Sequence, residues 1–412
     1  MAQPWRTDKW FVSPWNYTKE VTNQFEFPKK IKVHDTSLRD GEQQAGVEFT
    51  KDDKVRLAVN LAEAGVHRIE AGMPVASKYD ELAIKEIVKL NLGIPIFAFS
   101  RCMISDVERA VDCGVDGVII EMGCSKHILE NAYCHSLEWA IEHAIEATNF
   151  AHEQGLYVSF FPVDSSRADM NWYLDFVRKV NTDGYMDALV VVDTYGVLLP
   201  PAVIYIVKRL REQIKKPLEA HFHNDFGMAV ANTLAALSAG AEVAHTTVSG
   251  IGERSGNTPM EETVVALLTL YGIDTGIDTK KLCKLSKMVQ YMVKHQIPAN
   301  RAIVGRALFD VESGIPVSWM KNCLNKTPTV LFPLHWDLLG RHAPKVVLGK
   351  SSGRDSIVFW LDKIGHQKYE KPDIDNILLK VIDKSYQKKG LLTRMEFEEI
   401  VNTYFKDMAL LH

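Results

Sequence analysis

From about residue 30, short apolar runs of strand type alternate with longer segments of helical period. The strand candidates are Ile31–Asp35, Arg68–Gly72, Ile94–Phe99, Gly117–Glu121, Tyr157–Phe161, Ala188–Asp193, Leu218–His221 and Glu242–Val248. The helical segments between them are Lys51–Ala64, Ser77–Leu90, Ile104–Cys113, Leu137–Gln154, Asn171–Thr182, Ala202–Lys215 and Gly227–Ala239. This succession favours an α/β chain folded as a closed parallel (β/α)8 TIM barrel. The alternative, an open doubly wound sheet, lacks support because no G-x-G-x-x-G follows the first strand.

The 412 residues exceed the roughly 250 of a barrel. Two regions of the chain lie outside the alternation of strands and helices. Residues 1–29 carry three tryptophans, and we expect this extension to dock against the barrel or a partner subunit rather than to be a disordered leader. Residues 30–275 are the predicted catalytic barrel. Residues 276–412 are predicted to form a linker and a C-terminal, mainly α-helical subdomain, with helices at Thr279–His295, Asp373–Gln387 and Thr393–Met408.

The charge and composition exclude several classes of function. The formal net charge is −4, and no basic patch favours nucleic acid or an anionic membrane. No apolar run approaches the roughly 20 residues that span a bilayer, and the N-terminus lacks the apolar core of a signal peptide. The six cysteines form no C-x-x-C pair, which is typical of a reducing compartment. We therefore expect a soluble, cytoplasmic protein.

A His-x-His pair ends the seventh strand candidate. In a (β/α)8 barrel the catalytic groups lie at the C-terminal ends of strands, and residues two apart on a strand point to the same face. His221 and His223 can thus reach one ion, and Asp35 at the end of the first strand offers a carboxylate. The pattern predicts a divalent ion, Zn2+, Mn2+, Co2+, Fe2+ or Mg2+, held by these three residues. The alternative is a hydrogen-bonded core histidine beside an unrelated surface one.

Each of three further residues can be interpreted in two ways, as a functional or as a structural residue. Asn257, in a glycine-rich segment after the eighth strand, offers a neutral oxygen ligand or belongs to a plain loop. Arg39 forms a surface ion pair or faces a developing oxyanion. Glu70, inside the second strand, needs a buried partner, for which Arg39 is the candidate. A structural and a catalytic Arg–Glu pair look the same in the sequence.

Four separated motifs carry a family resemblance. They are HDTSLRDGEQ (34–43), IEAGMP (69–74), HFHND (221–225) and GIGERSGNTPMEE (250–262). The chain resembles the DRE-TIM metallolyase superfamily, most closely its acyl-CoA Claisen-condensing group of isopropylmalate, homocitrate and citramalate synthases. The resemblance runs from about residue 30 to 270 and resumes in residues 298–316 and 346–357.

The resemblance implies an acyltransferase that joins acetyl-CoA to a 2-oxo acid, hydrolyses the thioester and releases a 2-hydroxy acid and CoA. It also implies a homodimer and a divalent cofactor, Mn2+, Mg2+ or Zn2+. The resemblance implies Asp35, His221, His223 and Asn257 as metal ligands and Arg39 and Glu70 as catalytic residues. We expect Glu312 to act in catalysis in place of a missing family residue, and we expect substrate to be bound by Asp40, Gln43, Arg101, Thr194 and Ser125.

The chain departs from the family pattern at substrate and acid/base positions. The family's S-G-I-H reads S-G-I-P here, so Pro316 replaces a histidine, and Glu312, His335 or His342 is the expected substitute. The family's E-D-A-x-R reads Val163–Arg167 and loses a carboxylate, its G-K-H-S-G-R reads Gly349–Arg354, and residues 123–136 lack an expected arginine. These changes predict an unusual 2-oxo acid.

Two other functions stay open at this point. One is a metal-dependent lyase or aldolase that cleaves a carbon–carbon bond on the same barrel. Hydroxymethylglutaryl-CoA lyase is disfavoured among these, because residues 249–262 contain no cysteine. The other is a scaffold that binds metal without turnover.

Overall fold

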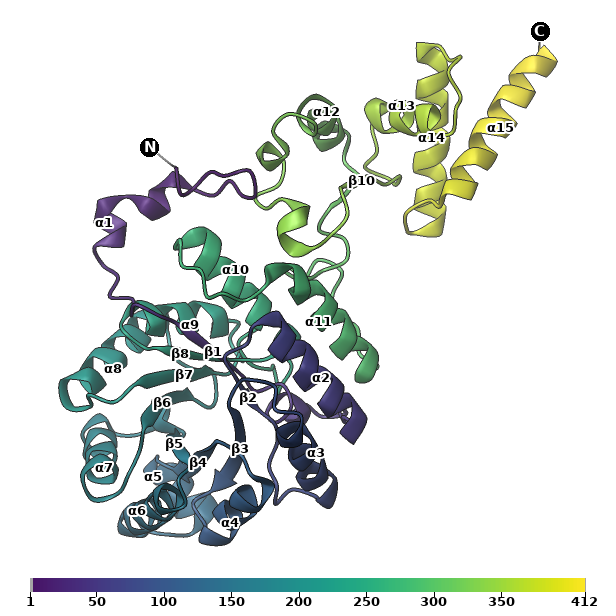
Figure 1. Ribbon diagram of the computed structural model, residues 1–412. Coiled ribbons are helices and arrows are strands. Elements are labelled where there is room, and N and C mark those ends of the chain that lie inside the picture. The colour runs from purple at the N-terminus through teal and green to yellow at the C-terminus, as the bar shows by residue number, and fades with distance from the viewer. Residues whose placement is uncertain (1–2, 412) are drawn as a thin grey trace. The chain divides into compact units, whose positions relative to one another are not determined.

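The computed structural model describes residues 3–411, and within this range eight parallel strands close into a barrel in sequence order (Figure 1). The strands are β1 (Lys32–Asp35), β2 (Arg68–Glu70), β3 (Ile96–Arg101), β4 (Gly117–Gly123), β5 (Tyr157–Val163), β6 (Ala188–Asp193), β7 (Leu218–Phe222) and β8 (Val243–Thr246). The barrel closes where β1 pairs with β8, from Lys32 opposite Val243 to Asp35 opposite Thr246. The predicted fold class is confirmed.

Helices alternate with the strands and cover the outside of the barrel (Figure 1). They are α2 (Lys51–Ala64), α3 (Lys78–Lys89), α4 (Ile104–Cys113), α5 (Lys126–Ile128), α6 (Leu137–Glu153), α7 (Met170–Asp183), α8 (Pro200–Gln213), α9 (Ala229–Ser238) and α10 (Met260–Leu270). Residues at the helix termini determine where these helices begin and end. The first helix of the ring, α2, starts at a capping box between Thr50 and Asp53 and stops at Gly65, whose φ of 91° is left-handed.

The barrel interior is filled by side chains, as in other barrels of this kind. One buried cluster comprises Phe97, Phe99, Ile119, Phe161, Val190 and Val192. Every residue of β6 is buried, which explains its uninterrupted apolar run. This packing fixes the directions of the strands, so the side chains at their C-terminal ends are held on a rigid rim.

The described chain separates into two compact units. The barrel unit comprises Ser13–Pro298 and Ala302–Val304, and the C-terminal unit comprises the remaining described residues. The barrel unit therefore extends past the expected boundary at residue 275. The reason is α11 (Thr279–Met292), which packs against α2 and α10 and buries Leu282, Leu285 and Val289.

The C-terminal unit is mainly helical, as expected. Its elements are β9 (Asp310–Val311), α12 (Gly314–Cys323), β10 (Lys345–Val346), α13 (Arg354–Lys363), α14 (Lys371–Lys388) and α15 (Arg394–Leu411). The core of α13, α14 and α15 includes Ile357, Val381 and Phe397. The sequence did not predict α12 or α13, which lie in a stretch rich in glycine and proline. Pro316 fits in the first turn of α12, where backbone N–H groups need no helical partner.

The N-terminal extension contributes to both units. Phe11 N donates to Pro333 O at 2.9 Å within the C-terminal unit. The remainder, including α1 (Lys19–Thr22), belongs to the barrel unit, where Tyr17 Oη donates to Thr269 O at 2.8 Å. Residues 1 and 2 of the extension lie outside the described residues. In the part of the chain that is described, no helix combines the length and apolar character that crossing a membrane requires.

Candidate metal centre and active site

The two histidines of the His-x-His pair meet at the C-terminal rim of the barrel. His221 lies in β7 and His223 directly follows it. Both imidazoles point the same way, as strand alternation requires, and their Nε2 atoms are 3.4 Å apart. The His221 ring packs edge-on against Phe161 inside the barrel, with ring centres 4.9 Å apart. The pair therefore presents two buried ring nitrogens to one point.

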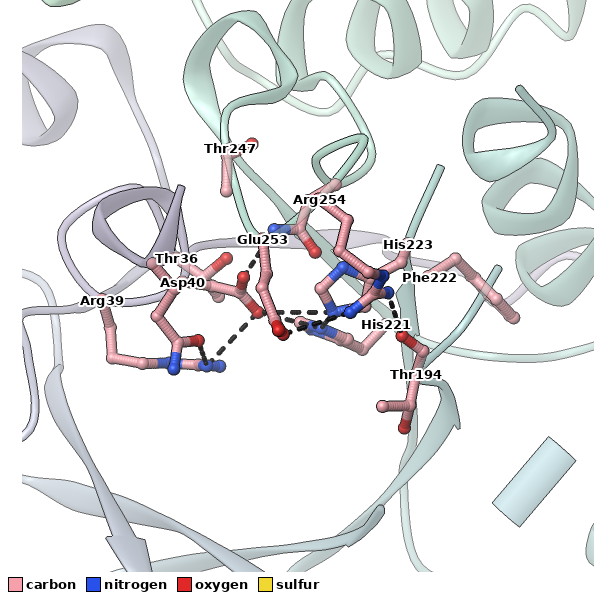
Figure 2. A network of polar contacts seen from close by, with 12 residues as sticks. Thr36, Arg39, Asp40, Thr194, His221, Phe222, His223, Thr247, Glu253 and Arg254 are labelled. Carbon is pink, nitrogen blue, oxygen red and sulfur yellow. Dashed lines mark hydrogen bonds and ion pairs between the residues drawn. The ribbon is translucent and has the colours of Figure 1, made fainter. Parts of the chain in front are cut away.

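The carboxylate that reaches this point belongs to Asp40. The loop after β1 folds back on itself, since Arg39 N and Gly41 N both donate to Thr36 O at 3.1 Å. Asp40 Oδ2 then lies 3.2 Å from His221 Nε2 and 3.8 Å from His223 Nε2. Figure 2 shows Asp40 between Arg39 and the two histidines. Among the described residues, Asp40, His221 and His223 are the group whose ligand atoms lie close enough to share a metal ion.

Asp35, the carboxylate expected from the sequence, is not brought to this group. On β1 the side chain of His34 points into the barrel, where it stacks on His245 with ring centres 4.6 Å apart. The next residue must point the opposite way. Asp35 accepts hydrogen bonds from Ser37 N at 3.0 Å and Ser37 Oγ at 3.1 Å instead. The expected set is therefore corrected: the structure joins Asp40, rather than Asp35, to the histidines.

The electrostatics of the cluster suit a cation. Burial opposes the ionisation of Asp40, but Arg39, His221 and His223 outweigh it and hold the pKa of this carboxyl well below its usual range. Burial lowers the pKa of His221, and it lowers the pKa of His223 to about 4. At neutral pH the cluster thus combines an ionised carboxylate with two neutral imidazoles, which are metal-ligand forms.

Asn257 lies beside this cluster. Its Nδ2 donates to Asp40 Oδ1 at 2.8 Å, and its Oδ1 is buried with no hydrogen-bond partner among the described residues. An unpaired buried oxygen is costly unless a ligand satisfies it. Gly256, with φ of 86°, brings the loop into place, because a Cβ there would collide with Gly250 O. This donor set of oxygen and imidazole nitrogen fits a divalent ion.

Arg39 and Glu70 form the predicted buried pair. Arg39 Nε donates to Glu70 Oε1 at 2.6 Å, and the guanidinium carbon lies 4.0 Å from the centre of the Phe99 ring. Arg39 Nη1 donates to Gln43 Oε1 at 3.0 Å and lies 3.2 Å from Asp40 Oδ2. Glu70 is fully buried, so the pair fixes the guanidinium beside the cluster. The predicted partnership of Arg39 and Glu70 is confirmed as a contact.

Two of the other predicted substrate residues converge on Asp164 at the end of β5. Ser125 Oγ donates to Asp164 Oδ2, and Asp164 N donates to Thr194 Oγ1 at 2.8 Å. Arg101 pairs with a different carboxylate, Asp106, with Arg101 Nε 2.7 Å from Asp106 Oδ2. Their binding roles stay predictions.

Glu312 belongs to the C-terminal unit, where Ser351 N donates to Glu312 Oε1 at 2.8 Å. It lines a pocket together with Lys350 and Tyr386. His335 lies in the same unit, and its ring stacks on Trp336. The catalytic role of Glu312 stays a prediction.

The contacts of Arg254, in the loop after β8, could not be predicted from the sequence. Arg254 pairs with Asp225, with Nε 2.8 Å from Oδ1. Its Nη2 donates to Thr194 O at 2.6 Å, a contact that Figure 2 shows. These contacts tie the loop to the ends of β6 and β7. The sequence offered one signal, an arginine in a glycine-rich segment, but the partner Asp225 lies 29 positions away along the chain.

The comparisons with known proteins agree with this architecture. The sequence profile of the HMGL-like family matches residues 30–289, so the chain belongs to that family. It is 37% identical to homocitrate synthase AksA of Methanopyrus kandleri, over 93% of this chain and 95% of that protein. It is 36% identical to 2-isopropylmalate synthase of Methanocaldococcus jannaschii, over 95% of this chain and 75% of that protein. The (R)-citramalate synthase CimA of the same organism is 38% identical over 81% of this chain and 67% of its own length.

Solved structures support the fold. The HMG-CoA lyase of Bacillus subtilis superposes with a TM-score of 0.61 at 21% identity, covering 68% of this chain and 99% of that one. The predicted resemblance to the superfamily is confirmed by the family match and these relatives.

Proposed function

We propose that this protein catalyses the metal-dependent condensation of acetyl-CoA with a 2-oxo acid, after which water hydrolyses the thioester to give a 2-hydroxy acid and CoA. The observation that carries the proposal is the convergence of Asp40, His221 and His223 on one buried point beside Arg39. Homocitrate, 2-isopropylmalate and citramalate synthases are among the named relatives, and the match covers 95%, 75% and 67% of their respective lengths. Their names favour a synthase over the lyase alternative.

Each side chain has a distinct task in this proposal. Asp40, His221 and His223 would hold the ion, with Asn257 Oδ1 as a further oxygen ligand. A bound divalent ion supplies Lewis acidity that polarises the ketone of the 2-oxo acid. Arg39 lies 3.2 Å from the Asp40 carboxylate, so its guanidinium would lie beside the ion and could stabilise negative charge on the ketone oxygen.

Glu70 keeps Arg39 in this position through the 2.6 Å hydrogen bond. Because the pair is buried under the rim, little reorganisation is needed when charge appears. Thr194, Ser125, Gln43 and Arg101 are the proposed contacts of the organic substrates. Glu312 is the proposed acid/base residue.

The proposal is tested by measuring thiol release from acetyl-CoA across a panel of 2-oxo acids, with Mn2+, Mg2+ or Zn2+ added to chelator-treated protein. We expect metal-dependent release of CoA with at least one acid and an equimolar 2-hydroxy acid product. A matched control is His221→Ala, which should lose both metal and activity. No CoA release with any acid, together with cleavage of a 2-hydroxy diacid, would overturn the synthase proposal in favour of a lyase.

We further propose that the enzyme is a homodimer in the cytoplasm and that Mn2+, Mg2+ or Zn2+ is its ion. The dimer rests on the family resemblance of residues 298–316, where Pro316 replaces the family histidine. Light scattering of the purified protein tests it, with a mass near twice 46.4 kDa as the expected result. A monomer at all concentrations would contradict it.

A further inference from the structure

A cavity of about 410 Å³ opens at the end of the barrel opposite the metal cluster. Its lining includes Lys32, Arg68, Tyr157 and Val243, which are the first residues of β1, β2, β5 and β8. The candidate metal cluster lies at the other ends of the strands, at the close of β7 and after β1. The cavity is therefore separate from the catalytic rim, in a region where barrels usually have only structural residues.

The positive charges of this cavity are only partly neutralised. Lys30 and Lys32 are exposed on its wall, and within residues 3–411 neither forms an ion pair. Arg68 is only 6% exposed; its Nη2 lies 2.8 Å from Glu219 Oε2, while its Nε has no hydrogen-bond partner in the described chain. A nearly buried guanidinium with an unused donor is ready to bind an acceptor.

The two carboxylates that line the cavity are already engaged. Asp116 Oδ2 accepts a hydrogen bond from Ile96 N at 2.8 Å. Glu242 Oε2 accepts from Leu218 N at 2.8 Å and pairs with Arg211. Glu242 is thus paired with a cation, whereas Asp116 keeps its negative charge, and the two lysine ammonium groups outnumber it on the cavity wall.

The remaining lining of the cavity is apolar and comprises Pro95, Phe97, Tyr157, Pro217 and Val243. The Arg68 guanidinium carbon lies 4.7 Å from the Phe97 ring centre and 5.7 Å from the Tyr157 ring centre. The Phe97 ring occupies this place because β4 starts with Gly117, where a Cβ would come within 2.6 Å of the ring. Aromatic faces beside cationic groups recognise a planar apolar body that carries a negative charge.

We propose that this cavity is a second binding site, which takes a small monocarboxylic acid with a planar apolar body. The carboxylate would lie among Lys30, Lys32 and Arg68. The apolar body would lie against Tyr157 and the exposed edge of the apolar lining, because Phe97 itself is only 2% exposed. The proposal is independent of the reaction at the metal cluster, so its test is a binding measurement.

Benzoate is the probe, and its neutral isostere benzamide is the comparison. Isothermal titration should show saturable binding of benzoate that is at least fivefold tighter than that of benzamide. The double variant Lys30→Gln, Lys32→Gln should weaken benzoate binding by roughly five- to tenfold, because two exposed charges at a binding site contribute modestly. Both lysines are exposed, so the variant keeps the fold.

The matched control is Lys280→Gln, Lys284→Gln, which removes two exposed lysines from α11 outside the cavity. It should bind benzoate as the parent protein does. A second arm titrates an aromatic amino acid, phenylalanine, to show whether an added ammonium group is tolerated. Equal binding of benzoate and benzamide, unchanged binding in the Lys30/Lys32 variant, or no saturable binding of benzoate would each overturn the proposal.

Discussion

Replacing Asp40 by asparagine tests the central assignment of the metal cluster. The substitution keeps the shape of the side chain and removes its charge, 3.2 Å from His221 Nε2 and 3.8 Å from His223 Nε2. Two unit charges about 4 Å apart interact by roughly 4 kcal/mol in a partly polar site, and a divalent ion doubles this. The amide oxygen of asparagine retains part of the interaction. We therefore expect a loss of about 3 to 4 kcal/mol, or a roughly 100- to 1,000-fold weaker affinity for Mn2+.

Asp35→Asn is the matched control, because both residues are buried acids at the same strand end. Asp35 faces Ser37 rather than the histidines, so its variant should bind Mn2+ within about threefold of the parent protein. The assay is a titration of chelator-treated protein with Mn2+, followed by calorimetry, with circular dichroism as a check of folding.

The two variants together decide which residue supplies the carboxylate ligand. If Asp40→Asn binds Mn2+ as the parent does while Asp35→Asn does not, the carboxylate assignment is wrong. If both variants fold and bind normally, the cluster is not the metal site. If Asp40→Asn loses the ion and Asp35→Asn keeps it, the loop after β1 supplies the ligand.

Three further outcomes follow from individual side chains. Burial raises the pKa of Asp35 to about 7 from 3.8, so ionisation of this carboxyl destabilises the folded protein. This loss of folding free energy is absent below about pH 4, grows as the pH rises and is complete above about pH 7. The free energy of unfolding of the parent protein should fall by up to about 4 kcal/mol across this pH window. Urea titrations at about pH 5 and about pH 8 should show a smaller fall for Asp35→Asn, which lacks the carboxyl group. The same pH dependence in the parent and the variant would contradict this expectation. Arg39→Lys loses the forked contact with Glu70, and kcat should fall by about 100-fold with little change in KM; an unchanged kcat in steady-state assays would exclude the oxyanion role. Gly256→Ala should lower the melting temperature and weaken Mn2+ binding more than Gly46→Ala, which has a similar φ of 83° but open space around it; equal effects of the two in thermal melts would show that backbone strain alone matters.

The barrel itself was readable from the sequence, because its determinants are local. Strand-type apolar runs at regular spacing identified all eight strands of the barrel within a few residues, and Ala188–Asp193 was predicted with its observed bounds. The chemistry of the helix ends is equally local, as the left-handed Gly65 after α2 illustrates. The His-x-His pair could also be predicted as a unit, since the two-residue period of a strand fixes the direction of both side chains.

The carboxylate partner of that pair depended on the tertiary structure. Sequence placed both Asp35 and Asp40 near the end of β1, but it could not show which one faces the barrel axis. Because His34 points into the barrel, its neighbour Asp35 points away from the barrel axis. The turn after β1 then brings Asp40 back to the C-terminal rim, beside the two histidines. The end of the barrel unit also depended on the tertiary structure. It lies beyond the expected residue 275 because the apolar face of α11 is buried on the barrel.

The sequence by itself determined the barrel, the family resemblance and the residue types available for the chemistry. Only the tertiary structure decided which acid joins His221 and His223, and which cavity collects Lys30, Lys32 and Arg68. The physical reason is the distance along the chain over which each kind of interaction acts. Periodicity and capping act over a few neighbouring residues, whereas a site is assembled from loops and strands whose side chains meet only after the barrel has closed.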